Sequence, residues 1–518
     1  MAKGAGLTLD RLFYQTLLRK PNEFLTEGQR KITYKELFED SVRLANGLSS
    51  CDLSGKRIAV LDWNSIEYAI ALYGIPFAGS SIHPINVRLP LEQISRTIKT
   101  ARDEALIVSK DFLPIAEKLA EAGLLSKKKI FTINVSSDDF SRFEDLIDDG
   151  EEVFTPKFDE DTEMSILFTS GTTGMPKAVS YTHRKTVTAI WAILTSLSAY
   201  QGLARLNSGD TVFPLIPFYH IWSWGSLFIS TMIGTKYILG GKFDPISTLK
   251  LIKSEKATWM NMVPTMLYAL LANDNESVLS GMKILIGGSP IPNGLVEEAR
   301  KRKIELTSIY GFTDGLIASI GTINEAYGKI EDERKYEIST KYSTPSPLAE
   351  LKIVKADGAP PEIFFRSPWL PDGYVSDETE TKNAYVEGWF RPGDSGHIDE
   401  MGNLCIDDRV KDLIKSGGEF IPSSTLESYI SGVPGVEMVA VVPRKDDKWV
   451  ERPVAFVKSN KDFDNLVRNI KDLFDSLVKS GKISSWWIPD EFYRIDNMPL
   501  TGTGKIDKKE LRKLLGGE

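Results

Sequence analysis

The stretch ILFTSGTTGMPKAV, from Ile166 to Val179, is the most informative part of this chain. It starts as an apolar strand and passes into a loop of glycines and hydroxyl side chains that ends at Lys177. Glycines let the backbone approach a polyphosphate closely, while hydroxyl and amide groups donate hydrogen bonds and a lysine adds positive charge. We therefore interpret this segment as a polyphosphate-binding loop that follows a strand.

The spacing within this loop separates it from the nucleotide loop of kinases and related enzymes. Gly171, Gly174 and Lys177 lie three residues apart, whereas the kinase-type loop follows the pattern GxxxxGK[ST]. A nucleoside-triphosphate kinase is therefore disfavoured. A plain surface turn is the alternative interpretation, but a turn does not require this combination of glycines, hydroxyls and a lysine.

Short apolar segments alternate with amphipathic ones on the N-terminal side of the loop. The pattern predicts strands over residues 57–63, 104–110 and 128–135, and helices over residues 65–79 and 114–125. Such alternation is typical of a mostly parallel sheet with helical crossovers. The expected fold class is therefore α/β.

The part of the chain that follows the loop predicts a second unit. Residues 324–341 are charged and weakly patterned, which indicates a surface excursion, and residues 348–368 predict two antiparallel strands joined by a turn at Asp357 and Gly358. Beyond Asp408, about a hundred residues predict a small α+β unit. We therefore expect two domains, residues 1–408 and 409–518.

The composition limits the function classes. The chain has 518 residues, which is too long for one ordinary core, and a formal net charge of −8. No basic block is long enough to favour nucleic acid as a partner. Two cysteines and four scattered histidines show no spacing of a disulfide framework or a zinc site.

The sequence also bears on compartment and membrane association. The first residues lack the apolar run of a signal peptide, so the cytoplasm is the expected location. Residues 213–234 carry no formal charge and are long enough to span a bilayer, but they include prolines, glycines and a histidine. We expect a strand, a loop and a buried helix there, not a transmembrane segment. The oligomeric state stays open, with a homodimer as one option.

Several further motifs occur in a characteristic order. They are LIGGSPIP at residues 285–292, SIYGFTDG at 308–315, GWFRPGDSGHID at 388–399, DRVKDLIKSGGEFI at 408–421 and MPLTGTGKIDKKELRK at 498–513. Together with the phosphate loop, they resemble the adenylate-forming superfamily, which includes acyl- and aryl-CoA synthetases, luciferases and the adenylation domains of peptide synthetases. The resemblance covers nearly the whole chain.

The resemblance implies a fold and a reaction. The implied fold is a large N-terminal domain of mostly parallel sheets with flanking helices and a small β-barrel-like subdomain, followed by a small mobile α+β C-terminal domain. The implied reaction converts a carboxylic acid and ATP, with Mg²⁺, into an acyl-adenylate. The acyl group then passes to coenzyme A.

The resemblance also assigns the nucleotide site. Thr313 would bind the α-phosphate and act in catalysis, and Asp314 would hold Mg²⁺ together with Thr169. The family has glutamate at the Asp314 position, so the metal contact here is either direct, with a shifted backbone, or through water. The remaining residues implied in ATP binding are Ser170, Gly171, Thr172, Thr173, Gly174, Lys177, Gly288, Ser289, Tyr310 against the adenine, Gly311 and Asp394 on the ribose.

The C-terminal motifs carry the implied catalytic and hinge residues. Lys505 would offset the repulsion between the acid's carboxylate and the α-phosphate, which stabilises the charged transition state. Arg409 would reach the nucleotide, with Lys415 also at the cofactor, and Lys411 matches the hinge between two orientations of the small domain. Gly417 and Gly418 would line the pantetheine tunnel. The neighbouring Lys508, Lys509, Arg512 and Lys513 are expected to be solvated.

The acid is the least determined part of the implied reaction. PLIPFYHIWSWG, residues 214–225, resembles a segment of medium- and long-chain fatty-acyl synthetases, in which His220 would lie near the carboxylate and act in catalysis. Trp224 would gate the acyl tunnel, and Gly287 would face the acid. The extra Trp222 would narrow the pocket and favour a shorter or more polar acid.

We therefore expect an acyl-CoA synthetase for a medium-chain fatty acid. Short-chain, hydroxy-acid and aryl-CoA synthetases remain open as alternatives, as does an acyl-AMP ligase without transfer to coenzyme A. A non-catalytic nucleotide sensor or a membrane-bound scaffold is disfavoured, because the phosphate loop, Asp394 and Lys505 are all present.

Overall fold

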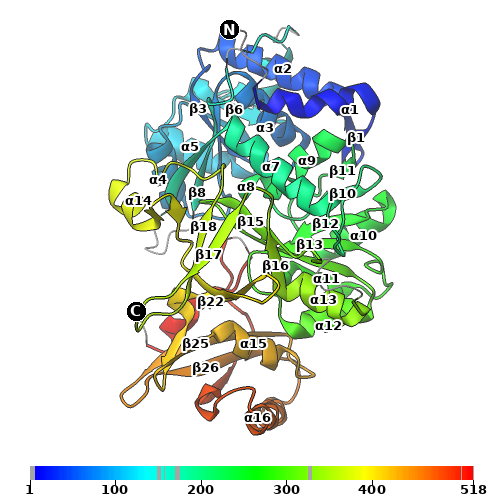
Figure 1. The fold of residues 1–518 in the computed structure, drawn as a ribbon. Helices are drawn as coiled ribbons and strands as arrows, with labels where there is room; N and C mark the ends of the chain where they lie inside the picture. Colours follow the sequence, from blue (N-terminus) through cyan, green and yellow to red (C-terminus); the bar gives the residue numbers. More distant parts are fainter. Residues whose placement is uncertain are drawn as a thin grey trace.

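The computed structural model describes residues 6–148, 153–156, 158–169, 176–324, 330–502 and 504–516. A large α/β body carries a small α+β unit at one end (Figure 1). The fold class predicted from the sequence is confirmed.

The first sheet of the body has seven strands in the order β7-β6-β5-β3-β4-β8-β9. All neighbours are parallel except the hairpin of β8 and β9. Its inner strands are buried on both faces, which explains their continuous apolar sequences. The strands are β3 (Arg57–Leu61), β4 (Ser81–Pro84), β5 (Ala105–Ser109), β6 (Ile130–Ile133), β7 (Ser141–Arg142), β8 (Glu163–Thr169) and β9 (Lys177–Thr182).

The second sheet has eleven strands in the order β2-β1-β11-β10-β12-β13-β14-β15-β16-β22-β21. Its neighbours from β1 to β14 are parallel, and those from β14 to β21 are antiparallel. The strands are β1 (Phe24–Glu27), β2 (Arg30–Thr33), β10 (Thr211–Pro214), β11 (Lys236–Ile238), β12 (Trp259–Met262), β13 (Lys283–Gly287), β14 (Glu305–Phe312), β15 (Leu316–Ile320), β16 (Tyr342–Pro345), β21 (Asp394–Ile398) and β22 (Leu404–Arg409).

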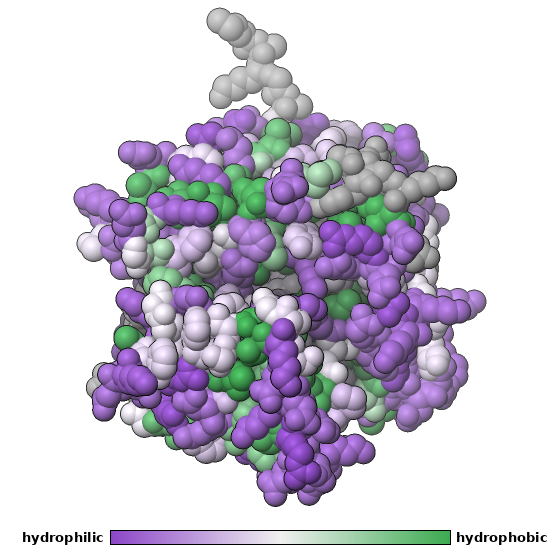
Figure 2. Space-filling model, turned by 60° about the horizontal axis from the view of Figure 1, so that its bottom comes forward, coloured by the Kyte–Doolittle hydropathy of each residue, from purple (hydrophilic) through white to green (hydrophobic). Residues whose placement is uncertain are grey.

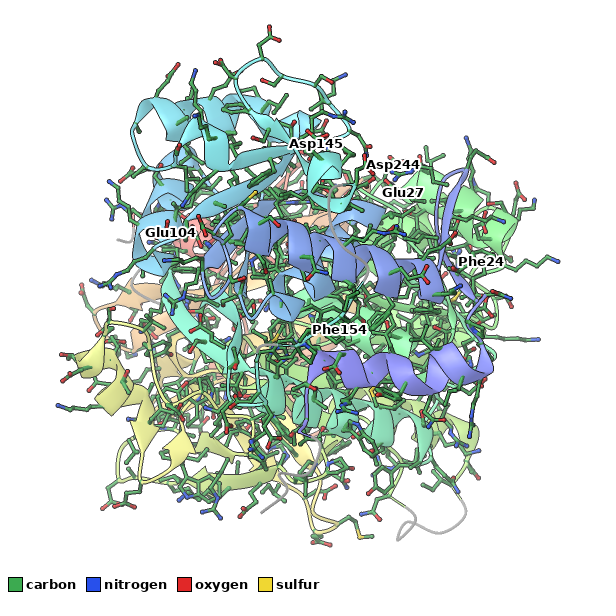
Figure 3. The ribbon with its side chains drawn as sticks, turned by 90° about the horizontal axis from the view of Figure 1, so that it is seen from above. Phe24, Glu27, Glu104, Asp145, Phe154 and Asp244 are labelled. Atoms are coloured by element: carbon green, nitrogen blue, oxygen red, sulfur yellow. The ribbon has the colours of Figure 1, made fainter. Side chains whose placement is uncertain are left out.

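Helix α3 (Ile66–Phe77) lies in the main core, and every one of its residues is buried. It begins where the Ser65 hydroxyl accepts from the Tyr68 N–H at 3.0 Å. The amphipathic α2 (Tyr34–Ser50) covers α3 and starts with a reciprocal cap between Thr33 and Glu36. Seen from the end opposite the small unit, α2 crosses the molecule, and Phe154 packs nearby (Figure 3).

The other helices of the body cover the sheets or connect their strands. They are α1 (Tyr14–Arg19), α4 (Leu91–Ala101), α5 (Leu113–Glu121), α6 (Phe143–Asp148), α7 (His183–Ser198), α9 (Ser226–Ile233), α10 (Pro245–Glu255), α11 (Pro264–Asn273), α12 (Asn293–Lys301), α13 (Asp332–Lys341) and α14 (Glu378–Ala384). The expected surface excursion at 324–341 is partly wrong: its second half is α13, whose Ile338 and Ser339 are buried.

The barrel-like part consists of antiparallel strands. A four-stranded sheet in the order β17-β18-β20-β19 packs against β21 of the long sheet. Its strands are β17 (Glu350–Val354), β18 (Glu362–Arg366), β19 (Tyr385–Val386) and β20 (Trp389–Phe390). The turn between β17 and β18 contains Gly358 with a φ of 72°, as the Asp-Gly pair predicts.

The small unit is built on one five-stranded sheet, and the face seen from its end is mostly hydrophilic (Figure 2). Its core forms between the sheet and the helices. The elements are β23 (Ile414–Ser416), β24 (Glu419–Ile421), α15 (Ser423–Ser431), β25 (Met438–Asp446), β26 (Val450–Lys458), α16 (Phe463–Lys479), β27 (Glu491–Arg494) and α17 (Lys508–Leu514).

The basic C-terminal helix differs from the sequence-based expectation. The Lys508 side chain is 16% exposed, and its ammonium lies 2.7 Å from the Glu427 carboxylate. Arg512 forms an ion pair with Asp412. These two residues are therefore structural and not solvated, because α17 packs its first and last turns against the rest of the small unit. Lys509 and Lys513 are exposed, as predicted.

The uncharged stretch at 213–234 lies inside the body. It contains the end of β10, a loop, and the buried helix α9. Among the described residues, no helix has both the length and the apolar character that crossing a membrane requires.

Candidate active site

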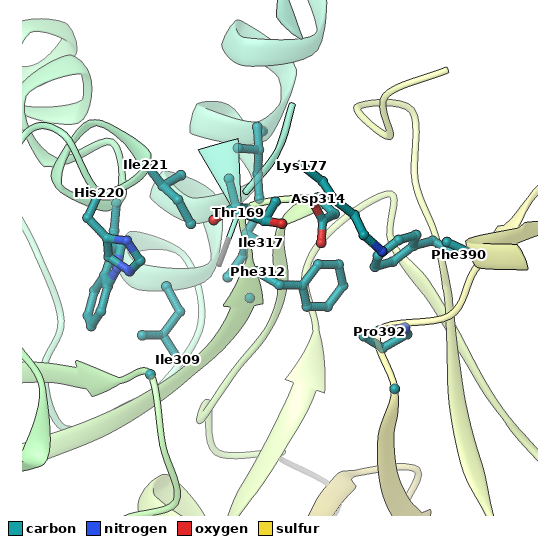
Figure 4. A pocket seen from close by; sticks show the side chains of 18 of the residues that line it. Thr169, Lys177, His220, Ile221, Ile309, Phe312, Asp314, Ile317, Phe390 and Pro392 are labelled. Carbon is teal, nitrogen blue, oxygen red and sulfur yellow. The ribbon is translucent and has the colours of Figure 1, made fainter. Parts of the chain in front are cut away.

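One large pocket lies where the two sheets of the body meet the small unit. Figure 4 shows Thr169, Lys177 and Asp314 on one side of it and His220 with Ile309 on the other. The sequence motifs therefore converge, although they are separated by up to several hundred residues in the chain.

The ends of the phosphate loop face this pocket. Thr169 ends β8 and Lys177 begins β9, and the two residues are cross-strand partners in the hairpin. Ser170, Gly171, Thr172, Thr173 and Gly174 lie outside the described residues. The strand pair nevertheless places both ends of the predicted loop at one edge of the pocket.

Lys177 is bound by residues that the sequence motifs did not reveal. Its ammonium pairs with Glu380 of α14 and lies 5.0 Å from the ring centroid of Tyr374. The Lys177 side chain is 13% exposed, so its ammonium is largely shielded from solvent. An anion that binds the Lys177 ammonium must therefore either share it with the Glu380 carboxylate or displace that carboxylate.

Asp314 is the residue whose surroundings best fit a bound cation. Burial raises the pKa of its carboxyl to about 7, although Lys177 and Arg409 act in the opposite direction. Its Oδ1 is buried and has no hydrogen-bond partner among the described residues. A carboxylate oxygen with no partner, lining the pocket together with the Thr169 hydroxyl, fits a hard cation such as Mg²⁺.

Asp394, Tyr310 and Arg409 form one connected group beside the pocket. The Tyr310 hydroxyl donates to Asp394 Oδ2 at 2.6 Å, and the Arg409 Nε lies 2.9 Å from Asp394 Oδ1. Asp394 is 4% exposed. Each Asp394 carboxylate oxygen can accept a second hydrogen bond, so Asp394 can still bind the two hydroxyls of a diol.

The glycines near this group allow close approach. A Cβ at Gly287 would lie 2.5 Å from the Ile309 carbonyl oxygen, and one at Gly288 would lie 3.0 Å from Lys505 Cε. Gly288 and Gly311 line the pocket, as does Thr313, whereas Gly287 and Ser289 lie beside it in the chain.

Lys505 reaches the pocket from the small unit. The Thr265 hydroxyl of α11 donates to the Gly504 carbonyl at 2.6 Å, and the Lys505 N–H donates to the Thr501 hydroxyl at 3.2 Å. Burial, together with the nearby Arg409, lowers the pKa of Lys505 to about 8. The ammonium is thus a cation at neutral pH that is close to losing its proton.

His220 lies at the other side of the pocket, on a loop held by two buried amides. The Phe218 N–H donates to Asn64 at 2.7 Å, and the Ile216 N–H donates to Asn261 at 3.2 Å. Burial lowers the pKa of His220 to about 3, and Lys505 acts in the same direction. The imidazole is therefore neutral and can accept or donate a hydrogen bond without bringing a charge.

The chain takes an unusual path directly after His220. Five successive residues, 221–225, have φ values between 47° and 71°, which makes a left-handed turn, α8 (Ile221–Trp224). Trp222 and Trp224 are buried in it and line the pocket, and the Trp222 indole donates to the Ser165 hydroxyl at 3.1 Å. A Cβ at Gly225 would lie 2.2 Å from Ile190 Cδ1, so glycine is required there.

A second contact joins the small unit to the body away from the pocket. Pro292 precedes α12 and offers no side-chain cap. Instead, the N–H groups of Asn293 and Gly294 donate to the hydroxyls of Ser428 and Ser431 on α15, each at 3.3 Å. The small unit thus satisfies free donors of a helix that belongs to the body.

Some predicted residues are not brought to the pocket. Lys411 is exposed in a short turn, Val410–Asp412, and Lys415 is exposed on β23. Gly417 and Gly418 form the two-residue turn between β23 and β24, with φ values of 62° and 82°. Two positive φ angles suit a tight hairpin, which explains the glycine pair.

Sequence reasoning missed several residues of this site. Glu380, Tyr374, Thr265 and the serines of α15 belong to no motif that we recognised. A signal existed only for Glu380, which lies eight residues before the GWF motif in a helix with an aspartate cap. The other contacts depend on how distant segments are brought together.

Comparison with known proteins places the chain in a family. Residues 13–375 match the family described as AMP-binding enzyme, and residues 425–505 match the AMP-binding enzyme C-terminal domain. The chain belongs to the AMP-binding enzyme family. The resemblance inferred from the motifs is confirmed.

Relatives of this AMP-binding enzyme include two fatty-acid ligases. It is 30% identical to a long-chain-fatty-acid–CoA ligase of Thermus thermophilus, over 93% of this chain and 90% of that protein. It is 31% identical to a medium-chain-fatty-acid–CoA ligase of Ectopseudomonas oleovorans, with the same coverage of 93% and 90%.

A solved structure shares the fold. The anthranilate CoA ligase in complex with anthranoyl-AMP aligns with a TM-score of 0.88 over 99% of this chain and 98% of that one, at 21% identity. The agreement confirms the fold of the AMP-binding enzyme, including the arrangement of a large body and a small C-terminal unit.

Proposed function

We propose that this enzyme is an AMP-forming acyl-CoA synthetase that activates an apolar carboxylic acid, with a medium-chain fatty acid as the leading substrate. The observation that carries the proposal is that Lys505 of the small unit enters the same pocket as Thr169, Asp314 and His220. Such an arrangement surrounds a site where a carboxylate can meet a polyphosphate.

Lys505 is the proposed catalytic cation of the first half-reaction. An acid carboxylate attacking the α-phosphate of ATP brings two anions together, and pyrophosphate leaves. A buried ammonium that touches both offsets this repulsion more strongly than it could in water. The neutral His220 supports orientation of the carboxylate, because it adds no competing charge beside Lys505.

Lys177, Thr169 and Asp314 are proposed to hold the polyphosphate and its Mg²⁺. Bound Mg²⁺ would neutralise charge on the leaving pyrophosphate. Asp314→Asn should raise the Mg²⁺ concentration needed for half-maximal adenylation, because a neutral amide is a poorer ligand for a hard cation. An unchanged Mg²⁺ titration would show that Asp314 does not hold the metal. Asp372→Asn, which changes an exposed carboxylate outside the pocket, is the matched control.

The second half-reaction is proposed to use another orientation of the small unit. Residues 1–408 would form the stationary domain, and residues 409–518 would rotate about Lys411. Gly417 and Gly418 are exposed in this structure while Lys505 is in the pocket. A rotation that withdraws Lys505 would bring the glycine turn to the pocket, where the coenzyme A thiol attacks the acyl-adenylate and AMP leaves.

The apolar half of the pocket supports the choice of acid. It is lined by Ala189, Ile190, Ile193, Ile221, Trp222, Trp224, Ile309, Leu316 and Ile317. The charged residues lining the described pocket are instead Lys177, Asp314, Glu362, Glu380, Arg391, Arg409 and Lys505. No charged lining residue comes from α7, α8 or β15, which supply most of the apolar lining, and this disfavours a substrate that carries an amino group.

Acid-dependent exchange between ATP and labelled pyrophosphate tests the proposal. A panel should include C4 to C16 fatty acids, hydroxy acids and benzoates, each with and without coenzyme A. We expect exchange to peak with a medium-chain acid and acyl-CoA to accumulate when coenzyme A is present. A peak with benzoates would favour an aryl-CoA synthetase, since Trp222 and Trp224 offer aromatic surfaces. Exchange without acyl-CoA formation would indicate an acyl-AMP ligase.

A further inference from the structure

A cluster of metal-binding side chains lies outside the pocket, on the strand pair β21–β22. His397 on β21 is the cross-strand partner of Cys405 on β22. Asp407 lies on the same strand as Cys405, two residues further along the chain. One nitrogen, one sulfur and one carboxylate oxygen from these residues all lie within 4.8 Å of one another.

An irregularity in the strand pairing brings Asp407 to the other two. The register shifts between Ser395 and Gly396, which pair with Asp408 and Ile406, so Asp407 is the extra residue of β22. A bulge of this kind turns a side chain out of the regular pleat. As a result, Asp407 Oδ1 lies 3.0 Å from His397 Nδ1 on the neighbouring strand.

The three side chains differ in exposure in a way that suits ligand binding. The His397 side chain is 56% exposed and that of Asp407 is 28% exposed, while Cys405 is partly buried beside them. Because the Cys405 thiol lies beside two more exposed ligands, a metal ion can reach it from solvent. Within the part of the chain that the structure describes, Cys405 and His397 are the only cysteine and histidine that come together in such a cluster.

We propose that His397, Cys405 and Asp407 form a binding site for a divalent transition metal, with Zn²⁺ as the best match and a fourth position left to solvent. Imidazole nitrogen, thiolate sulfur and carboxylate oxygen are the three ligand types that Zn²⁺ uses in proteins. Mg²⁺ and Ca²⁺ prefer oxygen ligands alone. The site is therefore distinct from the proposed Mg²⁺ position at Asp314.

The geometry requires only a small adjustment. With metal–ligand bonds of about 2.0–2.3 Å, a tetrahedral site holds its ligand atoms roughly 3.3–3.6 Å apart. The present separations are no greater than 4.8 Å. Rotation of the exposed His397 side chain can close the difference, because it is not packed in the core.

The position of the cluster gives metal binding a structural consequence. β21 starts at Asp394 and β22 ends at Arg409, and these two residues pair with each other at 2.9 Å. A metal on the same strand pair would hold together the segment that leads from the pocket to the small unit. We therefore expect bound Zn²⁺ to stabilise the protein and to slow any rotation that distorts β22.

The test uses the full-length, chelator-treated protein in nucleotide-free buffer. Co²⁺ serves as the spectroscopic probe, and Zn²⁺ is titrated by calorimetry and by its ability to displace Co²⁺. We expect one equivalent of metal and a sulfur-to-cobalt charge-transfer band in the near ultraviolet. Cys405→Ser should abolish the band, and His397→Gln should weaken binding by roughly tenfold or more. Excess Mg²⁺ should not compete.

Cys51→Ser is the matched control, because Cys51 is the other free cysteine and is exposed. It should retain the band, the stoichiometry and a Zn²⁺-dependent rise in melting temperature that Cys405→Ser lacks. His397→Gln alters an exposed side chain, so it remains informative if the cysteine variant folds poorly. The proposal is overturned if the wild type binds no stoichiometric metal, or if binding survives both Cys405→Ser and His397→Gln.

Discussion

Two of the contacts between the small unit and the body differ in kind. At the pocket, Lys505 brings a positive charge into the site, and the Thr265 hydroxyl donates a hydrogen bond to the neighbouring Gly504 carbonyl. At α12, the contact consists of two long hydrogen bonds from Asn293 and Gly294 and close backbone packing. The first contact places a charge in the pocket, whereas the second joins only uncharged groups outside it.

The effect of the Lys505 charge can therefore be tested separately from the positioning of the small unit at α12. A charge in a buried site acts through one atom, so its loss cannot be shared among neighbours. Hydrogen bonds between a helix start and two serines are individually weak and can be replaced by water when the unit moves away. Changes at Lys505 should therefore alter the first half-reaction itself, and changes at α12 should alter only how often the unit is in position.

The largest effect is expected from Lys505→Ala. Removal of the cation should slow adenylation by roughly 10²–10³-fold, because the approaching carboxylate and α-phosphate lose their shared counter-charge. Thioester formation from a supplied acyl-adenylate should be preserved. Single-turnover measurements of each half-reaction distinguish these steps, and an equal loss in both would mean that the variant is misfolded or that Lys505 serves both.

A smaller effect is expected from Gly294→Ala at the other contact. The new Cβ would lie 2.2 Å from the Ser431 carbonyl oxygen, so the small unit must shift. Overpacking of this kind costs about 1–3 kcal/mol, so adenylation should fall roughly 5- to 150-fold. Thioester formation from acyl-adenylate should be equal or faster. Glu297→Ala, on the exposed face of α12, should leave both rates near wild type.

The pH profile tests the charge contact without altering its packing. The pKa of Lys505 is about 8, and in the proposed mechanism the protonated form is the active one. The contribution of Lys505 should therefore be complete well below pH 8 and should be lost as pH rises through it, which lowers kcat/KM by about tenfold between pH 7 and pH 9. Lys505→Arg should flatten this limb, since guanidinium does not titrate there. A limb that persists in the arginine variant would belong to another group.

The smallest effect is expected from Ser431→Ala. It removes one hydroxyl cap from α12 and leaves the packing intact, which should cost about 0.5–1 kcal/mol and lower adenylation about two- to fivefold. In the Lys505→Ala background, Ser431→Ala should lower adenylation by the same factor as in the wild type, because it does not affect the chemical step itself. A loss as large as that of Gly294→Ala would show that the hydroxyl, and not the close packing, holds the unit.

Much of the fold and of the pocket could be predicted from the sequence. The strand–helix alternation placed β3, α3, β5 and β6 within a few residues, since apolar periodicity is a local signal. Each of Thr169, Lys177, Thr313 and Lys505 belongs to a short motif of the family that the chain resembles. The resemblance therefore predicts that they lie together, and the structure brings them to one pocket.

Other features could not be predicted because they depend on register and on docking. Cys405 and His397 have no metal-ligand spacing, and only the cross-strand pairing and the bulge at Asp407 bring them together. The Ser431 contact joins segments that are 137 residues apart. Lys508 looked like part of a basic tail, but its burial against Glu427 follows from how α17 packs.

The left-handed turn after His220 has a consequence for how the enzyme can evolve. Four of its five residues carry side chains, and each costs about 1–2 kcal/mol relative to a right-handed conformation. The total, roughly 4–8 kcal/mol, is comparable with the net stability of a whole domain. Packing of Trp222 and Trp224 must offset it. Ile221→Gly would relieve part of this strain at a residue that lines the pocket and would leave both tryptophans in place, so a wider pocket need not lower the thermal stability of the enzyme.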